Sequence, residues 1–176
     1  MKYLIVVDMQ NDFIDGALGT LEAQTILPAV VEKVRSFEGT VIFTRDAHAP
    51  NYLETQEGRN LPVPHCIQGE AGWELAPALK ALQVEKGAAV FDKLTFGCAE
   101  LPAYFREQAE PIESIEFCGV CTDICVVSNA LLLKAFFPEI PISADAGCCA
   151  GTTPENHQAA LTTMKMCQIQ ICGGQA

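Results

Sequence analysis

Short apolar runs alternate with helical patterns along the whole chain. In most of the runs nearly every residue is apolar, which is typical of strands buried on both faces of a parallel sheet. The last run alternates polar and apolar residues, as a strand at a sheet edge does. The six predicted strands are Tyr3–Val7, Thr40–Thr44, Ala88–Phe91, Ser114–Val120, Ile140–Ala144 and Gln168–Ile171.

The segments between these runs predict helices. Ile26–Phe37 has Pro28 near its start and Gly39 just past its end, which are favourable positions for both residues. The final helix begins at Thr153-Pro154-Glu155, where Thr153 is a good N-cap. The other predicted helices are Trp73–Leu82, Leu101–Gln108 and Asp123–Phe136.

Strands that alternate with helices predict an α/β fold with a doubly wound, mostly parallel six-stranded sheet. The length of 176 residues suits one domain, so we expect residues 1–176 to form a single unit. In such a sheet, ligands bind beyond the carboxyl ends of the strands. The residues that follow each strand are therefore the candidates for chemistry.

Charge narrows the choice of partners. Asp and Glu number 22 against 11 Lys and Arg, which gives a net charge near −11. Nucleic-acid binding depends on Lys and Arg contacts to phosphates, and anionic membrane surfaces repel an acidic chain. No apolar run approaches the ~20 residues that span a bilayer. We expect neither nucleic acid nor membrane as a partner.

Cysteine is abundant, with nine residues. The start of the chain has only five apolar residues, Tyr3–Val7, before Asp8. A secretory signal peptide needs an apolar core of ~7–15 residues. We therefore expect a cytoplasmic protein with reduced thiols, in which most cysteines are small buried hydrophobic residues.

Three strand ends carry a carboxylate, an ammonium and a thiol. Asp8 follows the first strand, where it suits a proton acceptor, or alternatively caps the next loop. Lys93 follows the third strand, where it would stabilise an anion, or alternatively reaches solvent or pairs with Asp92. Cys125 is expected in the first turn of a helix after Gly119, where the helix N-terminus lowers a thiol pKa; otherwise it is a core residue. Because the carboxyl ends of parallel strands meet at one edge, these groups together indicate an activated cysteine hydrolase.

The second strand ends beside a candidate metal site. Asp46 and His48 lie on the loop that follows it, and His65 comes downstream. Two imidazoles and one carboxylate can bind Zn²⁺, Fe²⁺ or Mn²⁺ and leave positions open for water or substrate. The alternative is two surface histidines on a long loop.

Two motifs give the chain a family resemblance. V-D-M-Q-N-D-F at residues 7–13 and G-V-C-T-D-I-C-V at residues 119–126 are specific when they occur together. With them the sequence resembles the isochorismatase-like cysteine hydrolases, and among them the nicotinamidase-like branch. The resemblance implies a three-layer αβα sandwich with an Asp–Lys–Cys triad, which maps onto Asp8, Lys93 and Cys125. It also implies a cis peptide between Val120 and Cys121, and an oxyanion hole formed by the N–H groups of Cys121 and Cys125.

The nicotinamidase-like branch also implies a divalent metal, zinc or alternatively iron or manganese. Asp46, His48 and His65 match its ligands, and a Glu between the histidines, Glu57 in preference to Glu54, would add a fourth. The branch further implies an aromatic residue packed on the substrate ring, which Phe13 matches. Nicotinamidases often carry Trp shortly before the second metal histidine; this chain has Leu61 in that stretch, and we expect it to contact substrate. His157 is expected to be structural.

The resulting hypothesis is a homo-oligomeric amidohydrolase that cleaves a small, nicotinamide-like carboxamide through a thioester. An N-carbamoyl or biuret-type amidase would not need the metal ligands, and an isochorismatase-type vinyl ether hydrolase would not need Cys125. A thiol-redox or zinc-binding protein is suggested by the Cys-x-x-Cys spacing of Cys118 and Cys121 and by the pair Cys148-Cys149.

Overall fold

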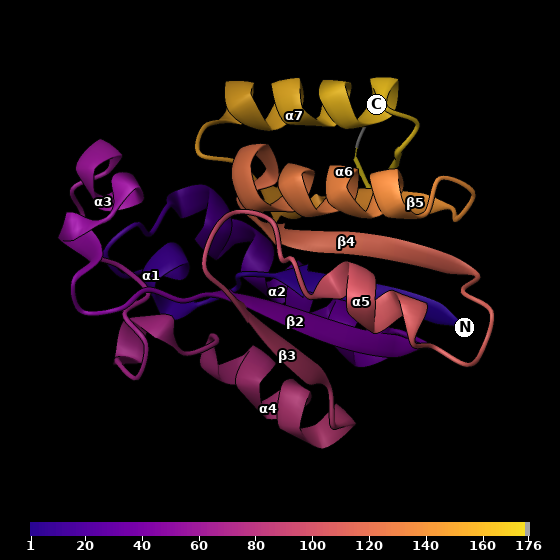
Figure 1. The fold of residues 1–176 in the computed structure, drawn as a ribbon, viewed down its shortest axis with the longest axis horizontal. Helices are drawn as coiled ribbons and strands as arrows, with labels where there is room; N and C mark the ends of the chain where they lie inside the picture. The colour runs from indigo at the N-terminus through magenta and orange to yellow at the C-terminus, as the bar shows by residue number, and fades with distance from the viewer. Residues whose placement is uncertain (175–176) are drawn as a thin grey trace.

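One six-stranded sheet forms the centre of the molecule (Figure 1). The computed structural model describes residues 1–174. The strands are all parallel and lie in the order β3-β2-β1-β4-β5-β6, which confirms the predicted parallel α/β sheet. Their bounds are β1 Lys2–Val7, β2 Thr40–Asp46, β3 Ala89–Lys93, β4 Ser114–Val120, β5 Ile142–Ala150 and β6 Gln170–Cys172.

The apolar runs form strands because both faces of the sheet are covered. In β1, Ile5 and Val7 pack into the core on one face, while Leu4 and Val6 pack into the core on the other. A strand with two buried faces needs apolar residues at every position. β6, whose run alternates polar and apolar residues, lies at an edge of the sheet as predicted.

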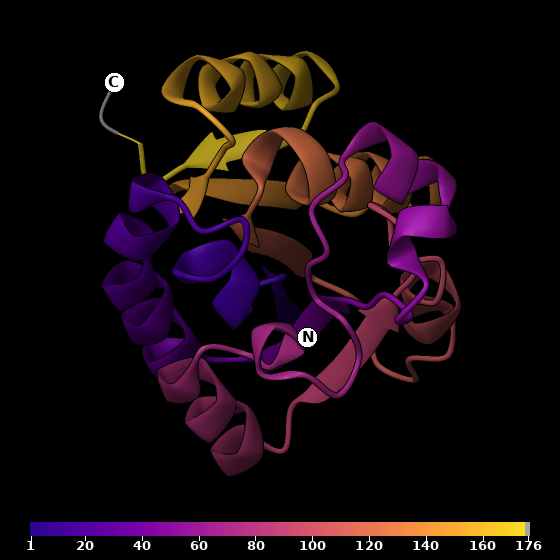
Figure 2. The same cartoon turned by 90° about the vertical axis from the view of Figure 1, so that its left-hand side faces the viewer.

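Helices cover the two faces and complete three layers. α2 and α4 lie together on one face, where Val30, Val34 and Leu79 fill the core (Figure 2). The other core includes residues of α5, α6 and α7. The helices are α1 Asn11–Ile14, α2 Leu21–Ser36, α3 Gln56–Asn60, α4 Pro77–Lys86, α5 Leu101–Arg106, α6 Val127–Phe136 and α7 Pro154–Met166, with short 3₁₀ turns at Tyr52–Glu54 and Ala71–Trp73 and a π-helical turn at Thr122–Val126. Within residues 1–174, no helix is both long enough and apolar enough to cross a bilayer.

Two helix starts differ from the sequence-based prediction. α2 begins at Leu21 because Thr20 caps it, its side chain accepting a hydrogen bond from the Ala23 N–H at 3.0 Å, so Pro28 lies inside the helix and not near its start. α4 begins at Pro77 and not at Trp73, which lies in a 3₁₀ turn.

A third start differs, whereas a fourth is confirmed. The segment predicted as a helix from Asp123 opens with the π-helical turn. Thr122 and Asp123 are residue types that favour N-cap positions, but the N-cap of this turn is Cys121. Asp123 instead accepts two hydrogen bonds from Thr152. α7 begins at Pro154 with Thr153 as its N-cap, as predicted.

Gly119 joins the sheet to the turn that follows β4. It pairs with Val7 across β1 and β4, and its φ is +115°, a backbone conformation that favours glycine. A Cβ at this position would collide with the backbone of Val7, directly before Asp8. Glycine here allows β1 and β4 to approach closely at the edge where the candidate residues lie.

We expect Gly119→Ala to lower the free energy of unfolding by about 3 kcal/mol, because overpacking and a strained φ act together. Gly87→Ala is the matched control: Gly87 also has a positive φ of +58°, but a Cβ there meets nothing within 4 Å. The control should lose only about 1 kcal/mol. Urea unfolding of both variants measures the difference, and equal losses would contradict the steric argument.

Candidate functional site

Four polar side chains meet at the carboxyl edge of the sheet. Asp8 follows β1, Asp46 ends β2, Lys93 ends β3, and Cys125 lies in the π-helical turn after β4. All four are buried. Burial of three ionisable groups beside a thiol is costly unless the charges compensate one another, so their mutual geometry decides what the site can do.

The ammonium group of Lys93 lies at the centre of this cluster. Its Nζ is 2.7 Å from Asp8 Oδ2, 3.2 Å from Asp46 Oδ1 and 3.4 Å from Cys125 Sγ. Only 1% of the Lys93 surface is exposed, so the lysine does not reach solvent. Asp92, the alternative partner, instead forms a bidentate pair with Arg45.

Asp8 is held in place by the neighbouring strand. Its Oδ1 accepts a hydrogen bond from Thr44 Oγ1 at 2.7 Å, and its own backbone N–H donates to the Thr44 carbonyl. Oδ2 forms an ion pair with Lys93 Nζ at 2.7 Å, and a carboxylate oxygen in such a pair keeps a further lone pair that can accept a proton. Burial raises the pKa of Asp8, against the opposing effect of the Lys93 charge. A raised pKa suits a proton acceptor.

The surroundings of the Cys125 thiol favour its protonated form. Burial raises its pKa well above the ordinary value, the negative charge of Asp8 adds to the rise, and Lys93 opposes it. The pKa of Lys93 is also raised, because Asp8 and Asp46 outweigh the effect of burial, so the ammonium keeps its charge. Burial and the charge of Asp8 thus oppose the lowering of the Cys125 pKa that is expected from a helix N-terminus. A nucleophile in this site needs a base to remove its proton.

The turn that carries Cys125 is fixed by hydrogen bonds from several directions. The Ile124 and Val126 N–H groups both donate to the Cys121 carbonyl, at 3.1 and 3.0 Å. The peptide between Val120 and Cys121 is cis, as the family resemblance implies. His157, which was expected to be structural, has its Nδ1 2.8 Å from Thr122 Oγ1. It therefore links this turn to α7.

Asn129 is a supporting residue that the sequence did not reveal. Its amide Nδ2 donates to the Cys125 carbonyl at 2.7 Å and to the Phe96 carbonyl at 3.1 Å, and its Oδ1 accepts from the Cys98 N–H at 2.7 Å. Asn129 therefore joins the cysteine turn to the segment after β3. The only sequence signal is a polar residue within the otherwise apolar face of α6.

A second group of side chains, which could ligate a metal ion, lies next to the cluster. One ligand atom from each of Asp46, His48, Glu57 and His65 lies within 4.8 Å of the others. The Nε2 atoms of His48 and His65 are 2.9 and 3.4 Å from Asp46 Oδ2, and Glu57 Oε1 is 3.6 Å from His48 Nε2. Glu57 therefore belongs to the group, and Glu54 does not.

The chemistry of these donors fits a divalent metal ion. Two imidazoles with two carboxylates suit zinc, iron or manganese. His65 Nδ1 lies 2.8 Å from the Val63 carbonyl, and a hydrogen bond there leaves Nε2 free to ligate, as is usual for metal-binding histidines. His48, His65 and Lys93 together lower the pKa of Asp46 despite its burial, so this carboxylate is ionised.

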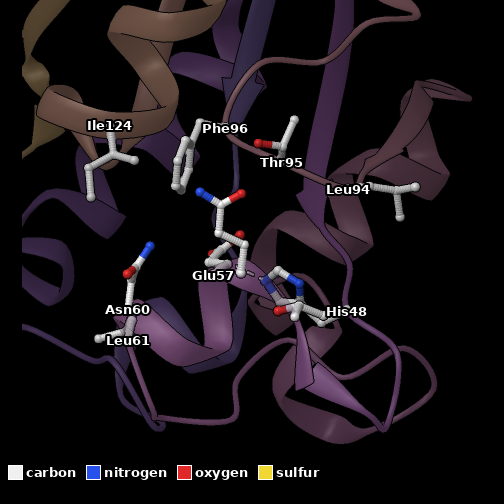
Figure 3. A pocket seen from close by; sticks show the side chains of 10 residues that line it. His48, Glu57, Asn60, Leu61, Leu94, Thr95, Phe96 and Ile124 are labelled. Carbon is white, nitrogen blue, oxygen red and sulfur yellow. Dashed lines mark ion pairs between the residues drawn. The ribbon is translucent and has the colours of Figure 1, made fainter. Parts of the chain in front are cut away.

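A cavity of about 510 Å³ opens beside His48 and Glu57 (Figure 3), and Asp8, Lys93 and Cys125 are not among the residues that line it. Leu61 lines it, together with Ile124, the neighbour of Cys125. Phe13 is not among the lining residues; its ring contacts His65 edge-on, with 5.7 Å between centroids. The full lining consists of His48, Thr55, Gln56, Glu57, Asn60, Leu61, Leu94, Thr95, Phe96 and Ile124.

A thiol, a carboxylate and an ammonium lie together at the carboxyl edge of this parallel sheet. These are the groups that a hydrolytic enzyme with a cysteine nucleophile needs, and the fold is α/β. The chain belongs to the isochorismatase family, because the family model described as isochorismatase domain matches residues 2–175.

Known relatives agree with this assignment. A nicotinamidase from Acinetobacter baylyi is 29% identical over 157 residues, which cover 73% of this chain and 72% of the relative. The structure of a pyrazinamidase from Pyrococcus horikoshii in complex with zinc superposes with a TM-score of 0.80 at 29% identity, covering 98% of this chain and 99% of that one. A nicotinamidase/pyrazinamidase from Bacillus subtilis gives a TM-score of 0.84 at 28% identity, with coverage of 97% and 98%.

We expect the purified protein to bind one divalent ion per chain and His65→Ala to lower the affinity at least about 100-fold, because a ligand is lost. His157→Ala is the matched control, since His157 contacts Thr122 and lies outside the ligand group. Zinc titration after chelator treatment measures both affinities. Unchanged zinc binding by His65→Ala would exclude these four residues as the metal site.

Proposed function

We propose that this chain is a cysteine amidohydrolase that cleaves a small, nicotinamide-like carboxamide to a carboxylic acid and ammonia. The observation that carries the proposal is the Lys93 ammonium, which lies within 3.4 Å of a base, Asp8, and a nucleophile, Cys125. Relatives named nicotinamidase or pyrazinamidase support the choice of an amide as substrate.

Acylation needs the proton of Cys125 to be removed as the sulfur attacks. Asp8 takes this proton, and Sγ forms a bond to the carboxamide carbon. The charge of Lys93 stabilises the sulfur anion as it develops, which compensates for the raised thiol pKa. The Cys121 and Cys125 N–H groups would hold the oxyanion. When the C–N bond breaks, Asp8 returns the proton to the leaving group, which departs as ammonia.

Deacylation uses the same base, with water as the nucleophile. Asp8, again a carboxylate, accepts a proton from a water molecule, whose oxygen attacks the thioester carbon. The C–S bond breaks, the acid leaves, and the proton returns to the sulfur. Lys93 keeps its charge through both halves and serves as a fixed electrostatic partner.

Zinc is the metal we propose for Asp46, His48, Glu57 and His65, with iron or manganese as alternatives of the same coordination chemistry. When bound, the ion would supply a Lewis-acidic position for a heteroatom of the substrate. Phe13 and Leu61 remain the proposed substrate contacts. The cytoplasmic location, the homo-oligomeric state and the single domain over residues 1–176 stay predictions.

The other functions considered from the sequence have less support. An N-carbamoyl or biuret-type amidase, or an isochorismatase, would leave the four metal-ligand side chains without a role. A thiol-redox or zinc-binding protein would use sulfur, yet the metal-ligand group found within residues 1–174 contains no cysteine. All nine cysteines are free thiols in the structure.

We expect Cys125→Ala to lower the rate of ammonia release from nicotinamide at least about 10⁴-fold, because no other group can form the thioester. Cys118→Ala removes a buried thiol from β4 outside the site and should retain activity. Mass spectrometry of the quenched native enzyme should detect an acyl adduct that is missing in Cys125→Ala. An active Cys125→Ala variant would eliminate the nucleophile assignment.

We expect the acid limb of kcat/KM to lie above the ordinary Asp pKa of 3.8, because burial raises the pKa of Asp8 and its protonation removes the base. The hydrogen bond from Thr44 favours the carboxylate and lowers this pKa. Thr44→Val should therefore move the limb to higher pH by about one unit, the equivalent of one hydrogen bond to a charged group. A pH–rate profile measures the shift, with Thr163→Val on the exposed face of α7 as the control. A shift to lower pH would contradict Asp8 as the base.

A further inference from the structure

The cavity at the site is larger than the reacting groups require. Its volume is about 510 Å³, within the range of pockets that hold ligands of several rings. His48 and Glu57, which belong to the metal-ligand group, occupy one part of its wall. The remaining wall lies beyond that group and takes no part in the proposed chemistry, so it is available to the rest of the substrate.

Four apolar side chains form half of this remaining wall, and Thr55, Gln56, Asn60 and Thr95 form the other half. We define the outer subsite as the part of the cavity lined by Leu61, Leu94, Phe96 and Ile124. Figure 3 shows Phe96 and Ile124 on one side of the cavity, with Glu57 and Asn60 on the other. The outer subsite is made by three separate segments: the residue that follows α3, the segment after β3 and the cysteine turn.

Three of these residues expose large apolar surface. The exposed fractions are 39% for Leu61, 83% for Leu94 and 43% for Phe96. Apolar surface that gathers at the mouth of one cavity marks a binding site, because a ligand that covers it releases the water in contact with it. No Lys or Arg lines the cavity, so no cationic side chain of the outer subsite would pair with an anionic substituent. The wall therefore favours an uncharged, apolar substituent.

We propose that the outer subsite binds an apolar substituent on the carboxamide, so that the preferred substrates are primary carboxamides with an apolar part larger than one six-membered ring. This inference rests on the proposed amidohydrolase function. It assigns substrate selectivity to residues outside the Asp8–Lys93–Cys125 cluster. The selectivity of the enzyme can therefore be changed without removing the groups that perform the chemistry.

A matched pair of substrates tests the proposal. The first is nicotinamide, and the second is nicotinamide that carries a phenyl group at ring position 5, with the same amide and the same ring nitrogen. The native enzyme should release ammonia from the phenyl derivative with a kcat/KM about tenfold higher than from nicotinamide. The gain should lie in KM, because the substituent contacts the wall in the ground state and the transition state alike.

Phe96→Ala is the informative variant, and Phe136→Ala is its control. Both phenylalanines are 43% exposed, but Phe136 lies on α6 and does not line the cavity. Phe96→Ala should lower kcat/KM for the phenyl derivative three- to tenfold, the loss expected for one aromatic contact, and change that for nicotinamide less than twofold. Phe136→Ala should change neither value.

The outcomes separate the subsite from the function on which it rests. Ammonia release from both substrates with a preference for nicotinamide, or an equal effect of Phe96→Ala on both, overturns the subsite and leaves the amidohydrolase function intact. Release from neither substrate by the metal-loaded enzyme overturns the proposed function and the subsite together.

Discussion

The buried ammonium of Lys93 is the constraint on which the site depends. Removing a charged group from water costs several kcal/mol, and in this protein Asp8 and Asp46 supply the compensating charges at 2.7 and 3.2 Å. The three residues end neighbouring strands, so the parallel sheet itself brings them together. The same ammonium lies 3.4 Å from Cys125, and a charge held for structural balance is thereby also placed beside the nucleophile.

Asp46 connects the catalytic cluster to the metal-ligand group. One of its oxygens faces Lys93 and the other lies between the imidazoles of His48 and His65. A change at either group therefore alters the electrostatics of the other. In a buried environment such interactions are stronger than in water, because little solvent screens them. The Asp8–Lys93–Cys125 cluster and the candidate metal-ligand group are therefore electrostatically coupled through Asp46.

Residues from other elements hold the cysteine turn, Thr122–Val126, in place. Asn129 joins it to the segment after β3, His157 contacts it from α7, and Asp123 binds Thr152 by two hydrogen bonds. Gly119 lets the strand before the turn approach β1 at close range. These supports fix the position of the sulfur relative to Asp8 and Lys93, which a reaction that depends on near-contact distances requires. Asp8, Lys93 and Cys125 do not line the cavity, whereas His48 and Glu57 of the candidate metal-ligand group do.

The sequence by itself indicated the existence of all six strands, because a parallel strand buried on both faces is apolar at nearly every position, a local property of runs such as Tyr3–Val7. The bounds of the last two strands were wrong, since β5 is Ile142–Ala150 and not Ile140–Ala144, and β6 is Gln170–Cys172 and not Gln168–Ile171. The sequence also indicated Asp8, Lys93 and Cys125, since polar residues directly after such strands meet at one edge, and two motifs identified the family. The start of one helix was predicted wrongly: Thr20 caps α2, which begins at Leu21, whereas the prediction placed the start near Pro28.

Only the tertiary structure decided that Glu57 and not Glu54 joins the ligand group, that Arg45 and not Lys93 pairs with Asp92, and that Asn129 supports the turn. It also decided that the pKa of Cys125 is raised, because a pKa depends on burial and on charges contributed by distant parts of the chain.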